Sequence, residues 1–303
     1  MLHGKNGAIE MRVLLTGSTG FLGSHLLLAL LKEKYEVIIL KRSFSDFWRI
    51  EKYMPLVRVY DTDKTVLEEM FSVERIDVII HLATDYGRKS TSDAESILKS
   101  NIAFPTQLLQ LCVKHGVKVF INADTSTPTE YTLYSATKKA FLNIGRYHAA
   151  NYSIQFVNMV MEYIYGENDD GTGLVSLLFQ AITAGNKINA SLGEQKRDFV
   201  YVGDVVAAYM KLLESLGGLT DTYTEFSIGS GQSISLRKFV EITENVSGKK
   251  VNVQWGAIPY RKNELFDIKA DISKAEKYLT WQPETSLESG TKRTIDWYEK
   301  KNR

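Results

Sequence analysis

The chain has 303 residues. At about 150 residues per domain, this length predicts one large domain or two closely packed ones. Hydrophobic residues make up 44% and charged residues 24%, near the globular average, which excludes a disordered or fibrous chain. The 37 Lys and Arg residues balance 36 Asp and Glu residues, so no overall charge favours nucleic acid or an anionic membrane as partner. The single cysteine, Cys112, lies in an apolar run and is predicted to be a buried, inert thiol.

The sequence predicts neither a membrane anchor nor an export signal. No uninterrupted apolar stretch approaches the roughly 18 residues that span a bilayer, and residues 1–10 lack the apolar core of a signal peptide. Those residues precede a second methionine, Met11, and we assign them no function. We expect a soluble, cytoplasmic protein, and we predict no metal site.

Short β-branched segments alternate with helix-length amphipathic segments through the first half of the chain. This alternation predicts the α/β class, a parallel sheet with helices on both faces. The predicted strands are residues 12–16, 37–40, 56–60, 78–82, 117–122 and 154–160. Val66, Leu67, Met70 and Phe71 form one apolar stripe of an intervening helix and are predicted core residues. After Gly166 the alternation loosens, which predicts a smaller second lobe.

A glycine-rich loop follows the first strand and leads into a helix over residues 24–34. Its glycines allow a tight turn, a close approach to a pyrophosphate and close helix packing, while the free amides at the helix start attract an anion. Turns and helix starts also collect glycine, but the order strand, loop, helix favours a dinucleotide site. The predicted cofactor contacts here are Gly17, Thr19, Gly20, Phe21, Leu22 and Gly23.

With Thr16 before it, this loop resembles the TGxxGxxG fingerprint of the extended short-chain dehydrogenase/reductase family, the NAD-dependent epimerases and dehydratases. The resemblance extends from Met11 to about Tyr298. It implies a Rossmann-type, doubly wound parallel sheet. Residues 11–165 would form the NADP-binding domain, with later segments returning to it, and residues 166–303 mainly a substrate-binding lobe.

Three residues at the end of the second predicted strand indicate which dinucleotide binds. NAD-binding domains carry an acidic residue there, whereas this chain has Lys41, Arg42 and Ser43. These side chains can neutralise and hydrogen-bond a ribose 2′-phosphate, so the sequence predicts NADP(H). The alternative is a solvated basic loop.

The resemblance implies further cofactor contacts along the chain. Asp61, which ends the third predicted strand, matches the family's adenine contact. His81 ends an apolar strand, where a histidine is usually structural, and the segment after it matches the part of the family that lies beneath the cofactor. The implied contacts after His81 are Leu82, Ala83, Thr84 and Asn101.

Tyr134 and Lys138 begin the helix after the fifth strand and lie four residues apart, on one helical face. A free phenol has a pKa of about 10, and a nearby ammonium favours its anion, which suits Tyr134 to proton transfer. The spacing is common by chance, and the alternative is a surface pair. In this position the two residues match the family's catalytic pair.

The family's third catalytic residue is a hydroxyl at the end of the fifth strand. Thr125 is the first choice and Ser126 the second, while Ala123 occupies a position where other members keep the hydroxyl. The loop from Thr125 to Tyr134 is short for the family. The family's dehydratases carry Glu after the Asp that corresponds to Asp124, and its absence here disfavours dehydration.

Two arginines are predicted to bind a substrate diphosphate with their planar guanidinium groups. Arg197 lies in a segment that resembles the R-D-F/Y-V-x-V-x-D pattern of members acting on nucleotide sugars, and Arg261 lies further along the chain. The alternatives are pairing of Arg197 with Asp198 or Asp204, and simple solvation of Arg261.

Within the family, the chain looks most like the CDP-abequose and CDP-paratose synthases. That resemblance implies NADPH-dependent reduction of the 4-keto group of a CDP- or dTDP-linked 4-keto-6-deoxyhexose, for cell-surface polysaccharide synthesis. A 4-epimerase with tightly bound NAD and a non-catalytic NADP-sensing protein remain alternatives. The resemblance also implies a homodimer formed through the helices that carry Asn101 and Tyr134. The residues do not identify the base or the sugar.

Overall fold

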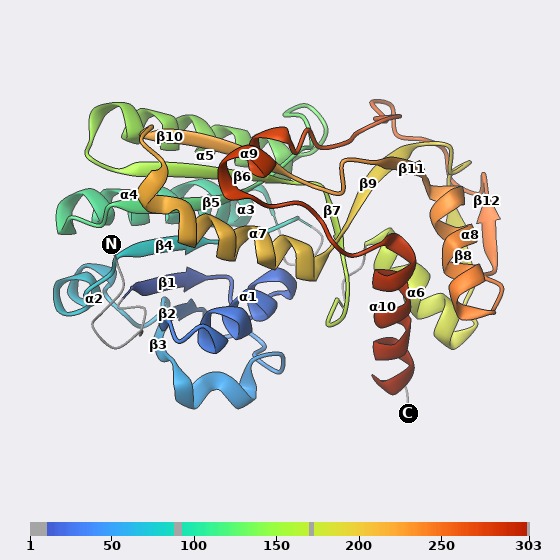
Figure 1. Ribbon diagram of the computed structural model, residues 1–303, viewed down its shortest axis with the longest axis horizontal. Coiled ribbons are helices and arrows are strands. Elements are labelled where there is room, and N and C mark those ends of the chain that lie inside the picture. The colour runs from blue at the N-terminus through green and yellow to red at the C-terminus, as the bar shows by residue number, and fades with distance from the viewer. Residues whose placement is uncertain (1–10, 88–92, 170–172, 302–303) are drawn as a thin grey trace. The chain divides into compact units, whose positions relative to one another are not determined.

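The computed structural model describes residues 11–87, 93–169 and 173–301, which divide into two compact units (Figure 1). The first comprises the chain up to Val160 together with Tyr209–Phe226, and the second comprises Met161–Ala208 and the chain from Ser227 onward. Residues 1–10 and residues 170–172, in the loop predicted after Gly166, lie outside the described residues.

A seven-stranded sheet forms the centre of the first unit. Its strand order is β10-β6-β5-β4-β1-β2-β3, and β1 pairs in parallel with β2 and β4, as do β2 with β3 and β4 with β5. The strands are β1 Arg12–Thr16, β2 Glu36–Lys41, β3 Arg58–Asp61, β4 Val78–His81, β5 Val119–Thr125, β6 Gln155–Met161 and β10 Tyr223–Ile228. The predicted α/β class and doubly wound parallel sheet are confirmed.

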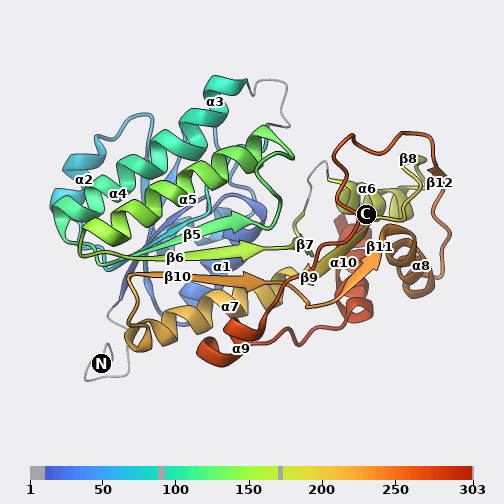
Figure 2. The same ribbon diagram turned by 90° about the horizontal axis from the view of Figure 1, so that it is seen from above.

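Helices cover both faces of this sheet, with α2, α4 and α5 on one face and α1 on the other (Figure 2). On the first face, Phe120, Phe141 and Phe156 are fully buried, and the rings of Phe120 and Phe156 stack at 5.7 Å. The bounds are α1 Phe21–Lys32, α2 Leu67–Val73, α3 Ala94–Leu98, α4 Phe104–His115 and α5 Leu133–Asn151, with a π-helix over Lys99–Ala103 that joins α3 to α4.

Several predicted boundaries shift for local reasons. Val66 precedes α2 and is 56% exposed, so its predicted place in the core is wrong, whereas Leu67, Met70 and Phe71 are buried as predicted. Leu56 is 65% exposed because it ends a 3-10 helix over Glu51–Leu56 instead of beginning β3.

Cys112 is buried in α4, as predicted, and burial raises the pKa of its thiol. A buried thiol of this kind is unreactive because it is the thiolate that acts as nucleophile. Across residues 11–87, 93–169 and 173–301, the structure has no helix of the length and apolarity needed to cross a membrane.

The second unit combines two small sheets with helices. The parallel pair β7 and β9 and the antiparallel pair β9 and β11 form one sheet, and β8 pairs with β12. Aromatic rings fill its interior, where Phe199 and Phe239 stack at 4.2 Å. The elements are β7 Tyr163–Tyr165, α6 Leu174–Ala184, β8 Ile188–Ala190, β9 Lys196–Tyr201, β11 Ser233–Ser235, α8 Leu236–Ser247, β12 Val253–Trp255, α9 Ser273–Leu279 and α10 Leu287–Lys301, while α7 Val202–Ser215 and a 3-10 turn over Leu216–Gly218 lead back to the first unit.

Gly145 allows α5 to pack closely on β6, because an added Cβ would overlap the ring of Phe156. Replacing glycine by alanine in a helix gains about 1 kcal/mol, and overpacking a core costs about 1–3 kcal/mol. Because the added Cβ would lie 2.2 Å from the ring, the cost falls at the upper end of this range, and we expect Gly145→Ala to lower the free energy of unfolding by about 2 kcal/mol in urea titrations. Asn143→Ala, at an exposed position of the same helix, is the control and should be unchanged or slightly more stable. Equal stability of the two variants would contradict the packing argument.

Candidate functional site

The glycine loop joins β1 to α1 and has the shape that a pyrophosphate requires. Gly17 has φ +72°, and a Cβ there would lie 2.7 Å from the backbone nitrogen of Ala83, so only glycine fits. No side chain caps α1 at Gly20, and its first turn contains no acidic residue, which leaves a positive helix end for an anion. The Oγ of Ser18 is buried and has no partner among the described residues. These features fit a dinucleotide.

The end of β1 is tied to the end of β4 beneath the segment predicted to contact the cofactor. The Thr16 hydroxyl accepts the Ala83 amide at 3.2 Å and lies 2.8 Å from His81 Nδ1. Burial, and secondarily the charge of Lys138, holds the pKa of His81 well below its ordinary value. His81 is therefore a neutral, structural residue.

Asn101 ties the loop after β4 to α5. Its Oδ1 accepts hydrogen bonds from the Thr84 hydroxyl at 3.0 Å and from the Asp85 amide at 2.8 Å. Its Nδ2 donates to the Asp85 carbonyl at 2.9 Å and to the Thr137 hydroxyl at 3.0 Å. The side chain is 1% exposed. Asn101 thus clamps the loop to the helix that carries Tyr134, and its contact with a cofactor stays a prediction.

Tyr134 and Lys138 lie in the first turns of α5, as predicted. Thr132 caps this helix through a reciprocal pair of hydrogen bonds with Ser135, at 3.1 and 3.0 Å. The ring of Tyr134 packs against that of Tyr86, with centroids 4.8 Å apart. Tyr86 is not among the residues predicted from the sequence, where its only signal is its place just after the segment that resembles the cofactor-binding part of the family.

Lys138 is 2% exposed, and this burial has an electrostatic consequence. Burial lowers the pKa of Lys138 to about 8, opposed by the negative charge of Asp124 and reinforced by the positive charge of Lys139. At neutral pH the ammonium is still protonated, so its charge can favour the anion of a nearby phenol.

The end of β5 presents Thr125, half-buried, where the hydroxyl was predicted. Its Oγ1 donates to Thr127 Oγ1 at 3.0 Å and accepts the Thr127 amide at 3.2 Å. Ser126 is also half-buried, and Ala123 is buried within the strand. Which hydroxyl contacts a substrate stays a prediction.

A chain of polar side chains runs across β5, β6 and β10 below this point. Asn122 donates to Asn158 at 2.7 Å, and Asn158 donates to Asp124 at 3.0 Å and to Glu225 at 2.9 Å. Asn122, Asn158 and Asp124 are buried. This network is not among the features predicted from the sequence, although amides inside apolar strands are a signal of buried hydrogen bonding.

Two carboxylates face the basic residues that end β2. Lys41 Nζ lies 3.7 Å from Asp61 Oδ2, which also accepts the Ser43 hydroxyl at 2.7 Å, and Arg42 Nε lies 3.1 Å from Asp63 Oδ1. The Ser43 hydrogen bond, and secondarily the nearby amide and lysines, lower the pKa of Asp61. A 2′-phosphate would therefore compete with Asp61 and Asp63 for this basic group.

In the second unit, Arg197 is held by its own chain. Its guanidinium pairs with Glu264 at 2.5 Å and donates to the carbonyls of Lys196 and Leu265 at 2.7 and 2.5 Å. Its partner is therefore neither of the acids considered from the sequence. Arg261 is exposed. It lies on a turn in which its own backbone carbonyl accepts the Glu264 amide at 3.1 Å.

The two acids near Arg197 in sequence hold backbone groups instead. Asp198 accepts the amides of Ser230, Gly231 and Ala270 at 2.6, 2.9 and 3.1 Å. Asp204 accepts amides of the segment before α10. These carboxylates fix the loops of the second unit.

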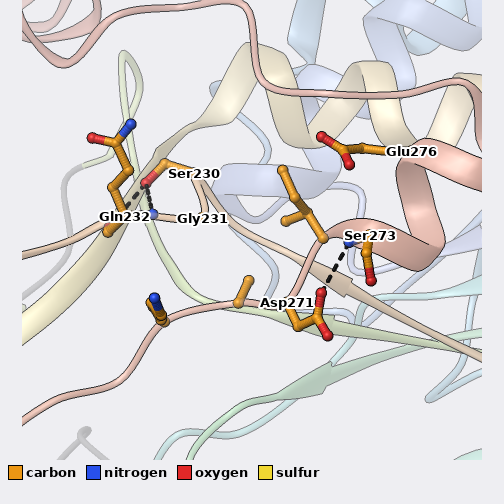
Figure 3. Close-up of a pocket in the computed structure, with 9 residues that line it drawn as sticks. Ser230, Gly231, Gln232, Asp271, Ser273 and Glu276 are labelled. Atoms are coloured by element: carbon orange, nitrogen blue, oxygen red, sulfur yellow. Dashed lines mark hydrogen bonds between the residues drawn. The ribbon is translucent and has the colours of Figure 1, made fainter.

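A hollow of about 560 Å³ lies in the second unit, where residues 230–232 meet residues 269–273 and Glu276; Figure 3 shows the residues that line it. Its polar groups bond partly within their own turns, as when Asp271 accepts the Ser273 amide at 3.1 Å, and partly to Asp198, which accepts the amides of Ser230, Gly231 and Ala270. None of the residues predicted for chemistry lines it. Among the described residues no group of His, Cys, Asp and Glu side chains could hold a metal ion.

Residues 13–229 match the family model described as the NAD dependent epimerase/dehydratase family. The chain belongs to this family. It is 30% identical to CDP-abequose synthase of Salmonella muenchen over 96% of the chain and 99% of that relative. It is 32% identical to CDP-abequose synthase of Salmonella typhimurium over 92% of the chain and 95% of the relative. A UDP-glucuronate 4-epimerase of Thermodesulfobacterium geofontis is 30% identical over 94% of the chain and 95% of its own length.

Solved structures of family members share the fold. UDP-glucose 4-epimerase of Thermotoga maritima, solved with UDP-glucose, matches with a TM-score of 0.86 and 25% identity over 97% of this chain and 100% of that one. UDP-glucuronic acid 4-epimerase of Bacillus cereus, solved with UDP-glucuronic acid and NAD, matches with a TM-score of 0.84 and 25% identity. The match covers 96% of this chain and 99% of that one. The resemblance to nucleotide-sugar enzymes of the extended family is thereby confirmed, and the chain is an enzyme of a nicotinamide-dinucleotide-dependent family.

The buried ammonium of Lys138 should destabilise the cofactor-free protein. Its pKa of about 8 in the folded chain, against an ordinary 10.5, means that the unfolded chain binds more protons between these values, so stability rises with pH there. We expect Lys138→Met to raise the free energy of unfolding at pH 7 by about 1–3 kcal/mol, and the gain should shrink above pH 8.

Denaturant titrations from pH 6 to 10 measure this difference. Lys118→Met, at an exposed position before β5, is the control and should show no pH-dependent difference from the parent protein. A Lys138→Met protein that is less stable than the parent at pH 7 would contradict the burial argument.

Proposed function

We propose that this protein is an NADPH-dependent reductase of the 4-keto group of a CDP- or dTDP-linked 4-keto-6-deoxyhexose, acting in the cytoplasm in cell-surface polysaccharide synthesis. The observation that carries the proposal is the similarity to two CDP-abequose synthases, which extends over almost the whole of each chain. Tyr134 and Lys138, together at the start of α5, support a redox reaction over simple binding.

The cofactor site is proposed to use groups of the first unit. The glycine loop and the start of α1 bind the pyrophosphate, the basic residues after β2 bind the 2′-phosphate, and Asp61 binds the adenine. When bound, NADPH supplies the hydride that adds to the carbonyl carbon. Residues Leu82, Ala83, Thr84 and Asn101 line the remaining length of the dinucleotide.

The proton reaches the carbonyl oxygen from the Tyr134 phenol, so the ketone becomes an alcohol with its atoms balanced. Lys138 stabilises the phenolate that remains and hydrogen-bonds the nicotinamide ribose. Thr125 donates a hydrogen bond that polarises the carbonyl, for which its hydroxyl proton turns from Thr127 Oγ1 to the substrate oxygen. Arg197 and Arg261 bind the diphosphate, for which Arg197 exchanges Glu264 for a phosphate oxygen.

The test is NADPH consumption with 4-keto-6-deoxy sugars linked to CDP, dTDP, UDP and GDP. Tyr134→Phe should lower kcat by about 10²- to 10⁴-fold, because the proton donor is lost, while NADPH binding is kept. The matched control is Tyr131→Phe, which removes a hydroxyl just before α5 and should leave kcat unchanged. Absence of turnover with all four nucleotides would reject the reductase.

A nucleotide-sugar 4-epimerase is the second candidate, favoured by the 30% identity to the Thermodesulfobacterium geofontis enzyme. The same tyrosine and lysine serve that reaction, but an epimerase retains NAD and needs no added cofactor. Purified protein that carries NAD and interconverts two unoxidised nucleotide sugars would establish this alternative. Dinucleotide binding without turnover of any sugar would instead favour an NADP-sensing protein.

The preference for NADPH is proposed to depend on Arg42, which is half exposed after β2. Losing a charged hydrogen bond to the 2′-phosphate should raise the KM for NADPH by about 10- to 100-fold in Arg42→Ala, with little effect on the KM for NADH. Arg75→Ala, before the start of β4 at the opposite end of the sheet, is the control. A parent protein that prefers NADH would contradict the cofactor assignment.

We also propose a homodimer that forms through α4 and α5, as implied by the family resemblance. Both helices carry exposed apolar or aromatic side chains, Val113 on α4 and Tyr147 on α5, which a second copy would cover.

A further inference from the structure

One ion pair holds both backbone groups of Thr125. Asp124 Oδ1 accepts the Thr125 amide at 2.7 Å, and Lys139 Nζ donates to the Thr125 carbonyl at 2.6 Å. The same ammonium lies 2.9 Å from Asp124 Oδ2. The peptide groups on either side of the Thr125 Cα are therefore fixed by two charged side chains, and this restricts where its hydroxyl can point.

The pair is built into the core and differs from a surface salt bridge. The Asp124 side chain is 0% exposed and that of Lys139 is 23% exposed. A buried carboxylate needs several partners, and Asp124 has a third in Asn158, whose Nδ2 donates to it at 3.0 Å. A solvent-exposed salt bridge restricts its side chains little, whereas a buried ion pair with all its hydrogen bonds made keeps its side chains in one geometry.

Two neighbouring lysines of α5 have different surroundings. Lys138 is almost fully buried in the turn after Tyr134, while Lys139 reaches back to the end of β5. Successive residues of a helix project about 100° apart, and Lys139 donates hydrogen bonds to Asp124 and the Thr125 carbonyl, whereas the charge of Asp124 acts on Lys138.

We propose that Lys139, acting through Asp124, is a positioning residue that holds the Thr125 hydroxyl toward the reacting oxygen of the substrate. The inference rests on the proposed function, which gives Thr125 and Tyr134 their roles. It goes beyond that function by assigning the second lysine of α5 to the geometry of the hydroxyl and not to the cofactor.

A double-mutant cycle tests this assignment. Thr125→Val removes the hydroxyl and should lower kcat by about 10²- to 10³-fold. Lys139→Met removes the ammonium and should lower kcat by about 10- to 100-fold, because a misplaced group loses its alignment. If Lys139 acts through this hydroxyl, Lys139→Met should cause no further loss in the Thr125→Val protein.

Three controls separate positioning from a general structural role. Lys139→Arg keeps a cation beside Asp124 and should recover most of the lost kcat. The Kd for NADPH, and the KM for the sugar, should stay within about threefold in Lys139→Met, since neither group is bound by this lysine. Asp124→Asn/Lys139→Met removes both charges, so it folds without a buried unpaired carboxylate and should keep the low kcat.

The outcomes distinguish this inference from the proposed function. Equal loss from Lys139→Met in the Thr125→Val and parent proteins, or a Kd for NADPH that weakens as much as kcat falls, overturns the positioning role. Unchanged activity of Thr125→Val overturns the role given to Thr125. The cycle is measured on whichever turnover the protein has, reduction or 4-epimerisation, because both use Tyr134 and a neighbouring hydroxyl.

Discussion

Parallel pairing of β1, β4 and β5 brings the carboxyl ends of three strands to one edge of the sheet. In that register Thr16 lies beside His81, and His81 lies beside Asn122. Ligands of open α/β sheets bind at this edge, beside the point where strand order reverses. The glycine loop, the Asn101 clamp and the start of α5 are all placed by this pairing.

The charged groups buried at this edge are stabilised by polar or charged groups close to them. Asp124 has Lys139, Asn158 and an amide, whereas Lys138 has a nearby carboxylate and a lowered pKa. Such groups cost stability in the free protein, as sites shaped for chemistry commonly do. The neighbouring Phe120, Phe141 and Phe156 supply compensating apolar burial.

The chain is similar both to CDP-abequose synthases and to a UDP-glucuronate 4-epimerase, so the fold by itself does not distinguish reduction from epimerisation. What differs between the candidates is how the dinucleotide is held and whether it leaves. The basic group after β2 is paired with Asp61 and Asp63, so a 2′-phosphate in the proposed site would compete with these carboxylates. In the second unit, Glu264 pairs with Arg197 and would compete in the same way with the proposed diphosphate.

The amino-acid sequence by itself determined the α/β class, the glycine loop and the place of Tyr134 and Lys138 on one helix, because periodicity, loop composition and helical spacing are local properties. Only the tertiary structure decided which groups meet across long stretches of chain. Arg197 and its partner Glu264 are 67 residues apart, and Asn122 and Asn158 are 36 apart. The packing of Tyr86 on Tyr134 and the bond from Lys139 to Asp124 are of the same kind. Such contacts depend on strand order and helix packing, which no local pattern of residue types encodes.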